Sequence, residues 1–155
     1  MKYSCLVFSE GRKDKIFLIA LIDLDKFKYH TKKWAFNYDN ASGSSPKTIL
    51  GQCRKTTLGK NYDLILCFID LDKLKSDYPK EWREEKKRLE VAYSNITIIW
   101  QINNAEDEYK KVLGGQRRSK HKLDKLSKQK VNEFINSAFW ERILKPIKDK
   151  EQELD

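Results

Sequence analysis

The sequence predicts an α/β protein with a mostly parallel, four-stranded central sheet, flanked by helices and followed by a C-terminal helical segment. Stretches typical of strands and of helices alternate four times along the chain, as in parallel sheets whose strands are joined by helices. One stretch, YDLILCFIDLD over 62–72, is almost continuously apolar, which indicates a central strand covered on both faces. The 155 residues suit a single domain with one full core.

The first half of the chain contains two of the expected strands, each followed by a helix. A β-rich run ends at a turn with Gly11, after which apolar residues recur at helical spacing. The loop ASGSSP over 41–46 separates the second strand from the second helix. The expected elements are a strand over 3–8, a helix over 13–27, a strand over 33–40 and a helix over 47–59.

The second half repeats this alternation and ends in a helix. The third helix is expected to start near Pro79, since proline is favoured in the first helical turn, and the fourth strand has an expected break at Ser94 and Asn95. The expected elements are a strand over 62–72, a helix over 78–90, a strand over 91–102 and a helix over 123–148. We therefore divide the chain into a sheet domain, 1–113, and a basic loop with a C-terminal helix, 114–155, that packs on the same domain.

The charge balance favours a polyanionic partner. Lys and Arg together number 32 against 23 Asp and Glu, which gives a net charge of +9, and such an excess is typical of proteins that bind nucleic acid. A glycine-led loop over 114–122 groups five residues that would neutralise phosphates: Arg117, Arg118, Lys120, His121 and Lys122. The alternative is that the charge only keeps the protein soluble and that this loop is solvated.

Cysteine usage and hydropathy point to a soluble, cytoplasmic protein with no membrane partner. The three cysteines, Cys5, Cys53 and Cys67, lack C-x-x-C spacing and do not suggest a disulfide framework or a zinc site. We expect Cys5 and Cys67, which lie in apolar runs, to be buried. No apolar run approaches the roughly 20 residues of a membrane span, and the N-terminal stretch is too short for a signal peptide.

Acidic residues follow two of the expected strands. Glu10 comes directly after the first strand, and Asp70 and Asp72 end the third. Because parallel strands present their carboxyl ends at one edge of the sheet, the three carboxylates are expected to lie together. A divalent cation would relieve their mutual repulsion, and oxygen-only ligands suit Mg²⁺ or Mn²⁺. The alternative is that all three are solvated strand ends.

The same acids support a resemblance to a known family. The stretch LVFSEGRKD over 6–14, followed by LILCFIDLD over 64–72, resembles the TOPRIM domain, whose signature is a glutamate in an E-G turn and a later D-x-D. The residues that match this signature are Glu10, Gly11, Asp70 and Asp72.

Within that family the chain is most similar to the RloB-like group, which occurs in bacterial defence and abortive-infection loci. The shared features are the E-G-x-K turn with Lys13, a Ser-Asn step before Trp100, and the loop DNASGSSPKTIL over 39–50. The resemblance covers residues 3–104. The chain departs from the group after the Ser-Asn step, where it lacks the usual Pro and has Ile99 in place of a Glu before the Trp.

The resemblance implies a TOPRIM-like, Rossmann-like fold and a nuclease dependent on Mg²⁺ or Mn²⁺. Its substrate would be DNA or RNA, tRNA included, and its setting would be an anti-phage or abortive-infection system. The metal ligands and catalytic acids would be Glu10, Asp70 and Asp72, with Glu10 as a ligand or as the general base. Lys13 would stabilise charge on the phosphate.

Other residues are expected to assist these. The expected nucleic-acid-binding residues are Lys73, Arg117, Arg118, Lys120 and Lys122. Asp14, Ser94 and Asn95 would support the metal ligands. The chain has no G-x-x-x-x-G-K-[ST] motif, so an ATPase partner would be a separate chain, and a second copy of this chain is the other expected protein partner. The alternative function is a catalytically silent TOPRIM-like module that binds nucleic acid or docks on an ATPase.

Overall fold

The computed structural model describes residues 2–22, 32–42, 45–101 and 138–155. Its strands are β1 (Tyr3–Ser9), β2 (Trp34–Asn40), β3 (Leu64–Asp70) and β4 (Thr97–Gln101). Its helices are α1 (Arg12–Ile22), α3 (Pro46–Thr57), α4 (Leu71–Asp77), α5 (Trp82–Ala92) and α8 (Ala138–Leu154).

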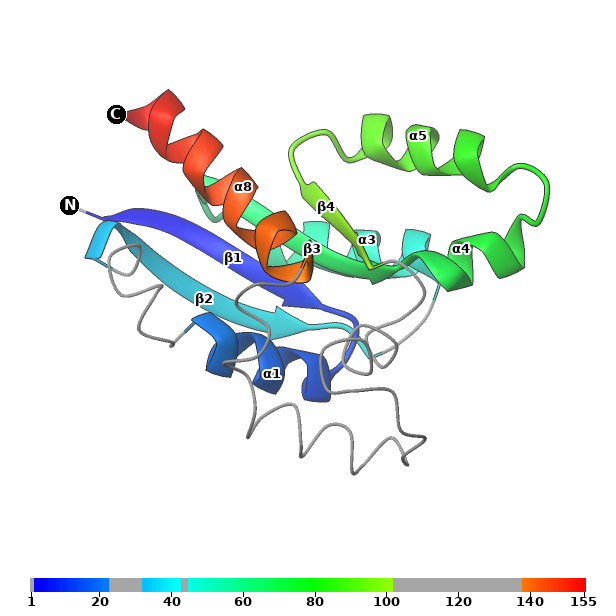
Figure 1. Cartoon of the computed structure of the whole chain (residues 1–155), viewed down its shortest axis with the longest axis horizontal. Coiled ribbons are helices and arrows are strands. Elements are labelled where there is room, and N and C mark those ends of the chain that lie inside the picture. Colours follow the sequence, from blue (N-terminus) through cyan, green and yellow to red (C-terminus); the bar gives the residue numbers. More distant parts are fainter. Residues whose placement is uncertain (1, 23–31, 43–44, 102–137) are drawn as a thin grey trace.

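The strands form one sheet in the order β2-β1-β3-β4, and every neighbouring pair is parallel (Figure 1). This arrangement confirms the predicted α/β class. Because all strands run the same way, the sheet has two chemically distinct edges. The carboxyl edge is formed by the strand ends Ser9, Asn40, Asp70 and Gln101. The amino edge is formed by the strand starts Tyr3, Trp34, Leu64 and Thr97.

Helices cover both faces of this sheet. On one face Val7 and Phe68 pack in a hydrophobic cluster with Ile147 of α8, and the same cluster includes residues of α1. On the other face Phe8 packs in a second cluster with Ile49 of α3 and with residues of α4 and α5. Figure 1 shows α8 lying across the sheet, on the face of the first cluster. The fold therefore has three layers, with the sheet between two layers of helices.

The apolar run in β3 follows from its place in these layers. Successive side chains of a strand point to opposite faces, so Leu66 joins the α8 cluster and Cys67 joins the α3 cluster. Both side chains are 0 % exposed. The prediction of a central strand covered on both faces is confirmed, and so is the predicted burial of Cys5 and Cys67.

The region after β3 differs from the sequence prediction. The strand ends at Asp70 and α4 begins at the next residue, so Asp72 lies in the first turn of a helix and not at a strand end. The helix predicted over 78–90 corresponds to α5 alone, which begins later, at Trp82, with Pro79 in the turn before it. Helix α4 has no counterpart among the predicted elements. Helix α4 begins inside the stretch predicted as the end of the third strand, and Leu71 and Leu74 anchor it in the core.

Two further boundaries also differ. The strand predicted over 91–102 begins only at Thr97, because α5 continues to Ala92 with Val91 77 % exposed. Helix α8 extends to Leu154, beyond the predicted end at 148, and Ile143 and Ile147 fix it to the sheet. The predicted domain division at 113 lies outside the described residues.

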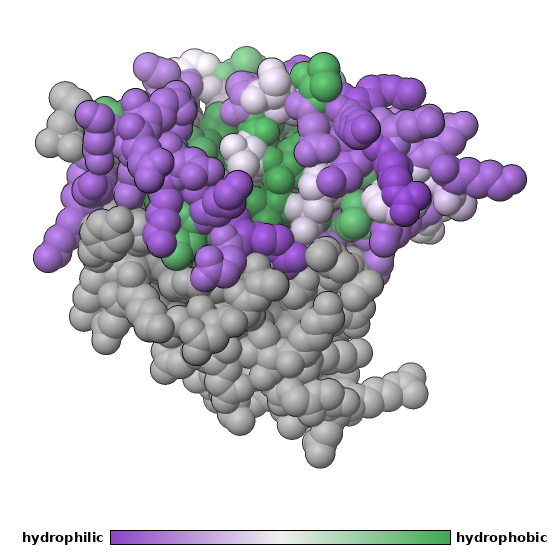
Figure 2. Space-filling model, turned by 45° about the horizontal axis from the view of Figure 1, so that its top comes forward, coloured by the Kyte–Doolittle hydropathy of each residue, from purple (hydrophilic) through white to green (hydrophobic). Residues whose placement is uncertain are grey.

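The described surface is mostly polar. Figure 2 shows hydrophilic side chains surrounding a smaller hydrophobic area on one face. In the parts of the chain that the structure describes, no helix is both long enough and apolar enough to cross a membrane.

Candidate functional site

Two of the predicted acids meet at the carboxyl edge, where β1 and β3 end side by side. Glu10 follows the last residue of β1, and Asp70 is the last residue of β3. The Glu10 carboxylate oxygen Oε1 accepts a hydrogen bond of 2.7 Å from the backbone N–H of Asp70. Residues sixty positions apart in sequence are therefore joined directly, and this bond fixes the position of the Glu10 carboxylate.

The Asp70 side chain has an unusual position for a helix-capping residue. Asp70 is the N-cap of α4, with φ −71° and ψ 123°, yet its carboxylate makes no hydrogen bond to the first turn of that helix. An aspartate at this position ordinarily accepts such a bond. Its oxygen Oδ1 is shielded from solvent. The carboxylate thus sits at the sheet edge without serving as the cap of α4.

The negative charge of Glu10 reaches the core below it. The pKa of the Cys67 thiol is raised well above its ordinary value, first by a hydrogen bond with Cys53, then by burial, and further by the charges of Cys53 and Glu10. Burial also raises the pKa of the Cys5 thiol. Both thiols are fully buried core side chains.

The two acids have the chemical character that Mg²⁺ or Mn²⁺ binding requires. Within the described residues, no group of three or more His, Cys, Asp or Glu side chains is placed to hold a metal ion. Mg²⁺ commonly uses one or two carboxylates, with waters and substrate phosphates completing its coordination. Glu10 and Asp70 are the two residues that could supply such carboxylates here. Asp72 lies half-buried two residues further on, in α4.

Other polar residues at the carboxyl edge were not singled out from the sequence. Gln101, at the end of β4, is 3 % exposed and pairs in register with Asp70. Ser9 is 0 % exposed and donates a hydrogen bond of 3.1 Å to the Gly11 carbonyl. Asn40, at the end of β2, donates to its neighbour's carbonyl. The signal that identifies them is their position, because each is a polar residue at the end of a strand.

The two residues near the E-G turn lie at the start of α1. The Lys15 N–H donates to the Gly11 carbonyl at 3.1 Å, so the helix starts directly after the turn. This places Lys13 and Asp14 in its first turn, at the carboxyl edge. The positions of their side chains lie outside what the structure describes. Lys73 is exposed on α4, three residues after Asp70.

Ser94 and Asn95 are not brought to the acids. They lie in the turn before β4, at the amino edge, where they line a cavity of about 620 Å³ together with Lys145 of α8. The length of β4 separates them from Asp70. The four predicted nucleic-acid-binding residues of the basic loop lie outside the described residues: Arg117, Arg118, Lys120 and Lys122.

Comparison of the chain with protein-family models and with curated proteins finds no match. The chemistry of the site therefore has to be inferred from Glu10, Asp70 and the residues around them.

Proposed function

We propose that the protein is a TOPRIM-like nuclease, dependent on Mg²⁺ or Mn²⁺, that cleaves phosphodiester bonds in DNA or RNA, tRNA included. The observation that supports this most directly is the 2.7 Å hydrogen bond from the Asp70 N–H to Glu10. It joins the E-G turn to the D-x-D segment at the edge of the sheet where α/β proteins bind their ligands. The proposed setting is a bacterial anti-phage or abortive-infection system.

The roles of the acids follow from their charge and position. A divalent cation, when bound, polarises the phosphoryl oxygen and activates water. Glu10 and Asp70 supply anionic oxygens for it, and Asp72 is the third acid assigned to the site. Because Glu10 is already held by a backbone N–H, little rearrangement is needed when the substrate arrives. Glu10 acts as a ligand or as the general base.

The substrate would be held by positive charge around these acids. Lys13 is assigned to the transferring phosphate and Lys73 to the flanking strand, and the basic loop over 114–122 would bind further phosphates. The net charge of +9 supports a polyanionic substrate. The protein would act in the cytoplasm, with a separate ATPase chain or a second copy of itself as a partner.

A second candidate is a catalytically silent module that binds nucleic acid or docks on an ATPase. The observation in its favour is that the described residues assemble two carboxylates and not three. A binding module would need no metal. Removing a metal-ligating carboxylate should therefore abolish the activity of a nuclease and leave the binding of a silent module intact.

The test is cleavage of plasmid, single-stranded DNA and total tRNA with Mg²⁺, Mn²⁺ or EDTA. Asp70→Asn removes one anionic ligand and keeps the shape of the side chain. Asp77→Asn is the matched control, because Asp77 is an exposed acid at the other end of α4. We expect metal-dependent cleavage by the wild type and the control, and none by Asp70→Asn. Equal cleavage by all three proteins would refute the assigned site, and absence of cleavage with intact binding would favour the silent module.

A further inference from the structure

A polar groove lies on the face of the sheet that α3 covers, beside β2. In β2 the residues Trp34, Phe36 and Tyr38 belong to the cluster on the opposite face. The alternate residues, including Ala35 and Asn37, are exposed on the α3 side. This leaves a groove of about 490 Å³ between β2 and the segment that follows α3. The volume is within the usual range for a small-molecule or nucleotide site.

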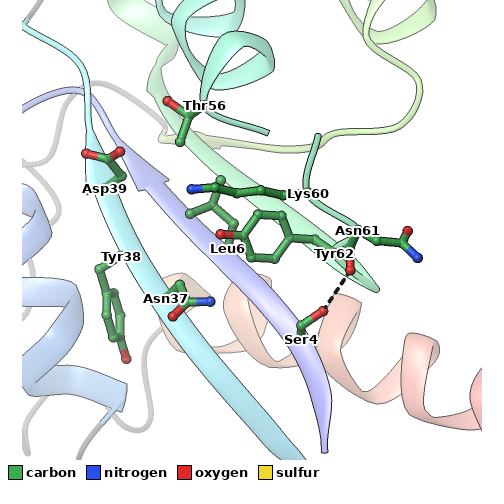
Figure 3. Close-up of a pocket in the computed structure, with 9 residues that line it drawn as sticks. All are labelled: Ser4, Leu6, Asn37, Tyr38, Asp39, Thr56, Lys60, Asn61 and Tyr62. Atoms are coloured by element: carbon green, nitrogen blue, oxygen red, sulfur yellow. Dashed lines mark hydrogen bonds between the residues drawn. The ribbon is translucent and has the colours of Figure 1, made fainter. Parts of the chain in front are cut away.

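The far wall of the groove is built by the turn at the end of α3. Gly59 has φ 74°, the left-handed conformation that glycine adopts readily, and the Lys60 N–H donates to the Thr57 carbonyl at 3.0 Å. The chain then runs back toward β3, and Ser4 of β1 donates to the Asn61 carbonyl at 3.2 Å. Figure 3 shows Lys60 and Tyr62 extending over Leu6 in the direction of β2.

The lining combines the groups that bind a nucleobase and its phosphate. Leu6 is 2 % exposed and forms an apolar floor, and the half-buried Tyr62 offers an aromatic ring for stacking. Asn37 and Asp39 on β2 offer an amide and a carboxylate to the edges of a base. Lys60 brings an ammonium group, and no ion pair joins it to another residue that the structure describes.

Helix α3 and the segments on either side of it are rich in positive charge, and Lys60 among these residues lines the groove. Between 41 and 62 the chain has four cationic residues and no Asp or Glu. These cationic residues are Lys47, Arg54, Lys55 and Lys60. Arg54 packs over the Tyr93 ring and donates to the Ala92 carbonyl, so the three lysines are the residues that would attract a phosphate backbone along α3. An acidic peptide would meet the same positive charges, but the Asp39 carboxylate would repel it. A base with an exocyclic amine would instead donate a hydrogen bond to that carboxylate.

The groove ends close to the acids of the proposed nuclease site. Asp39 pairs in register with Phe8. Phe8 comes two residues before Glu10, so the two are about 7 Å apart along the chain direction of β1. The other end, at Ser4, is about 20 Å from Glu10 by the same spacing. We propose that this groove binds the bases of a single-stranded nucleic acid whose scissile phosphate lies at Glu10 and Asp70. The inference rests on the proposed nuclease function and adds that the substrate is single-stranded, since paired bases cannot stack on Tyr62.

The test measures binding apart from cleavage. Fluorescently labelled single-stranded DNA and RNA, and duplexes of the same sequence, are titrated with the full chain in EDTA and followed by anisotropy. Tyr62→Ala should weaken single-strand binding by about fivefold or more, as loss of one stacked base does, and Tyr62→Phe should retain it. Lys60→Ala should lower the slope of log affinity against log salt by about 0.7.

The matched controls are Tyr78→Ala and Lys80→Ala, the same residue types at the same spacing in the exposed turn between α4 and α5. They should bind as the wild type does. The inference is overturned if the groove variants lose no more affinity than these controls, if duplex binds as tightly as single strands, or if the wild type binds no single strand.

The outcomes also separate this inference from the nuclease proposal. Asp70→Asn should retain binding in EDTA, because neither Glu10 nor Asp70 lines the groove. Metal-dependent cleavage that needs Asp70 but not Tyr62 would leave the nuclease proposal in place and remove the groove. Binding that depends on the groove, without any cleavage that depends on Asp70, would support the groove and remove the nuclease proposal.

Discussion

The two edges of the sheet both contain acidic residues, but they use them differently. At the amino edge, two carboxylates at the end of the chain's last helix accept hydrogen bonds from side chains of other elements, while Asp63, before β3, accepts from the Ser4 N–H. Glu151 of α8 accepts from the Trp34 indole N–H at 2.9 Å, and Asp155 accepts from Tyr3 and from Lys33. At the carboxyl edge, Glu10 accepts from a backbone N–H, and the side chain of the N-cap residue Asp70 does not cap α4.

Under the proposed function, this difference separates acids that hold the fold from acids that bind the metal. The amino-edge contacts join the end of α8 to the starts of β1 and β2, so they stabilise the packing of the last helix. The carboxyl-edge contact holds the Glu10 carboxylate beside the end of β3, at the place where parallel sheets bind ligands. Changes at the amino edge should therefore alter stability, and changes at the carboxyl edge should alter activity.

The largest expected effect is on the activity of Glu10 variants. Glu10→Gln retains an oxygen that can accept from the Asp70 N–H, so the fold should persist while cleavage falls by about a hundredfold or more, the usual scale for loss of an acid–base group. Glu10→Ala should lose the same activity and also about 1–3 kcal/mol of unfolding free energy, since the Asp70 N–H loses this acceptor. Cleavage rates and urea unfolding of both variants measure the two effects.

This comparison fails if Glu10→Gln unfolds as readily as Glu10→Ala, or if it cleaves at the wild-type rate. The first result would make Glu10 a structural residue, like the acids of the amino edge. The second would remove it from the reaction.

The next effect concerns the helix that the amino-edge acids hold. Ile147 is 0 % exposed and packs α8 on the sheet. Ile147→Ala should lower the free energy of unfolding by about 2–5 kcal/mol, the usual cost of truncating a buried aliphatic side chain. Leu154→Ala, at the 37 % exposed end of the same helix, is the control and should change it little. A large loss of cleavage per folded molecule in Ile147→Ala would mean that the two edges are coupled.

How far the sequence predicts each region depends on the range of the interactions that form it. The parallel sheet was predicted from the alternation of strand-like and helix-like stretches along the chain. The burial of both faces of β3 was predicted from its continuous apolar run. The pairing of Glu10 with Asp70 was expected only as neighbours at one edge, because the hydrogen bond between them depends on tertiary packing. Helix α4 escaped prediction because Leu71 and Leu74 differ from other apolar residues only in where the core lies.

The side-chain contacts at the amino edge were not predictable from the sequence. Trp34 and Glu151 are 117 positions apart, and neither carries a motif that indicates the other. The groove beside β2 likewise depends on the turn at Gly59, which brings Lys60 and Tyr62 over the sheet. Sequence patterns locate residues at strand ends, whereas contacts between distant elements require the folded chain.

A smaller effect is expected from the buried pair at the amino edge. Trp34→Phe removes the indole N–H that Glu151 accepts while keeping an aromatic ring, and Glu151 is only 5 % exposed. The variant should lose about 1–3 kcal/mol of unfolding free energy, the cost of depriving a buried polar group of a donor. Glu151→Gln, which keeps an oxygen acceptor, should lose less. Thermal or urea unfolding measures both, and cleavage per folded molecule should stay unchanged.

The smallest effect is a pH dependence at the exposed end of the same edge. Hydrogen bonds from Tyr3 and then Lys33 hold the pKa of Asp155 below its ordinary 3.8. The stability that ionised Asp155 contributes is therefore present above that value and is lost as pH falls through the lowered pKa. The hydrogen bond to Asp155, more than burial, raises the pKa of Tyr3 above 10.0, so that contribution is lost as pH rises through the raised pKa. Asp155→Asn should therefore differ from the wild type in unfolding midpoint mainly between these limits. Glu153→Gln, which alters an exposed pair within α8, is the control. A difference between Asp155→Asn and the wild type that stays constant from pH 3 to pH 11 would show that the ionised contact does not stabilise this edge.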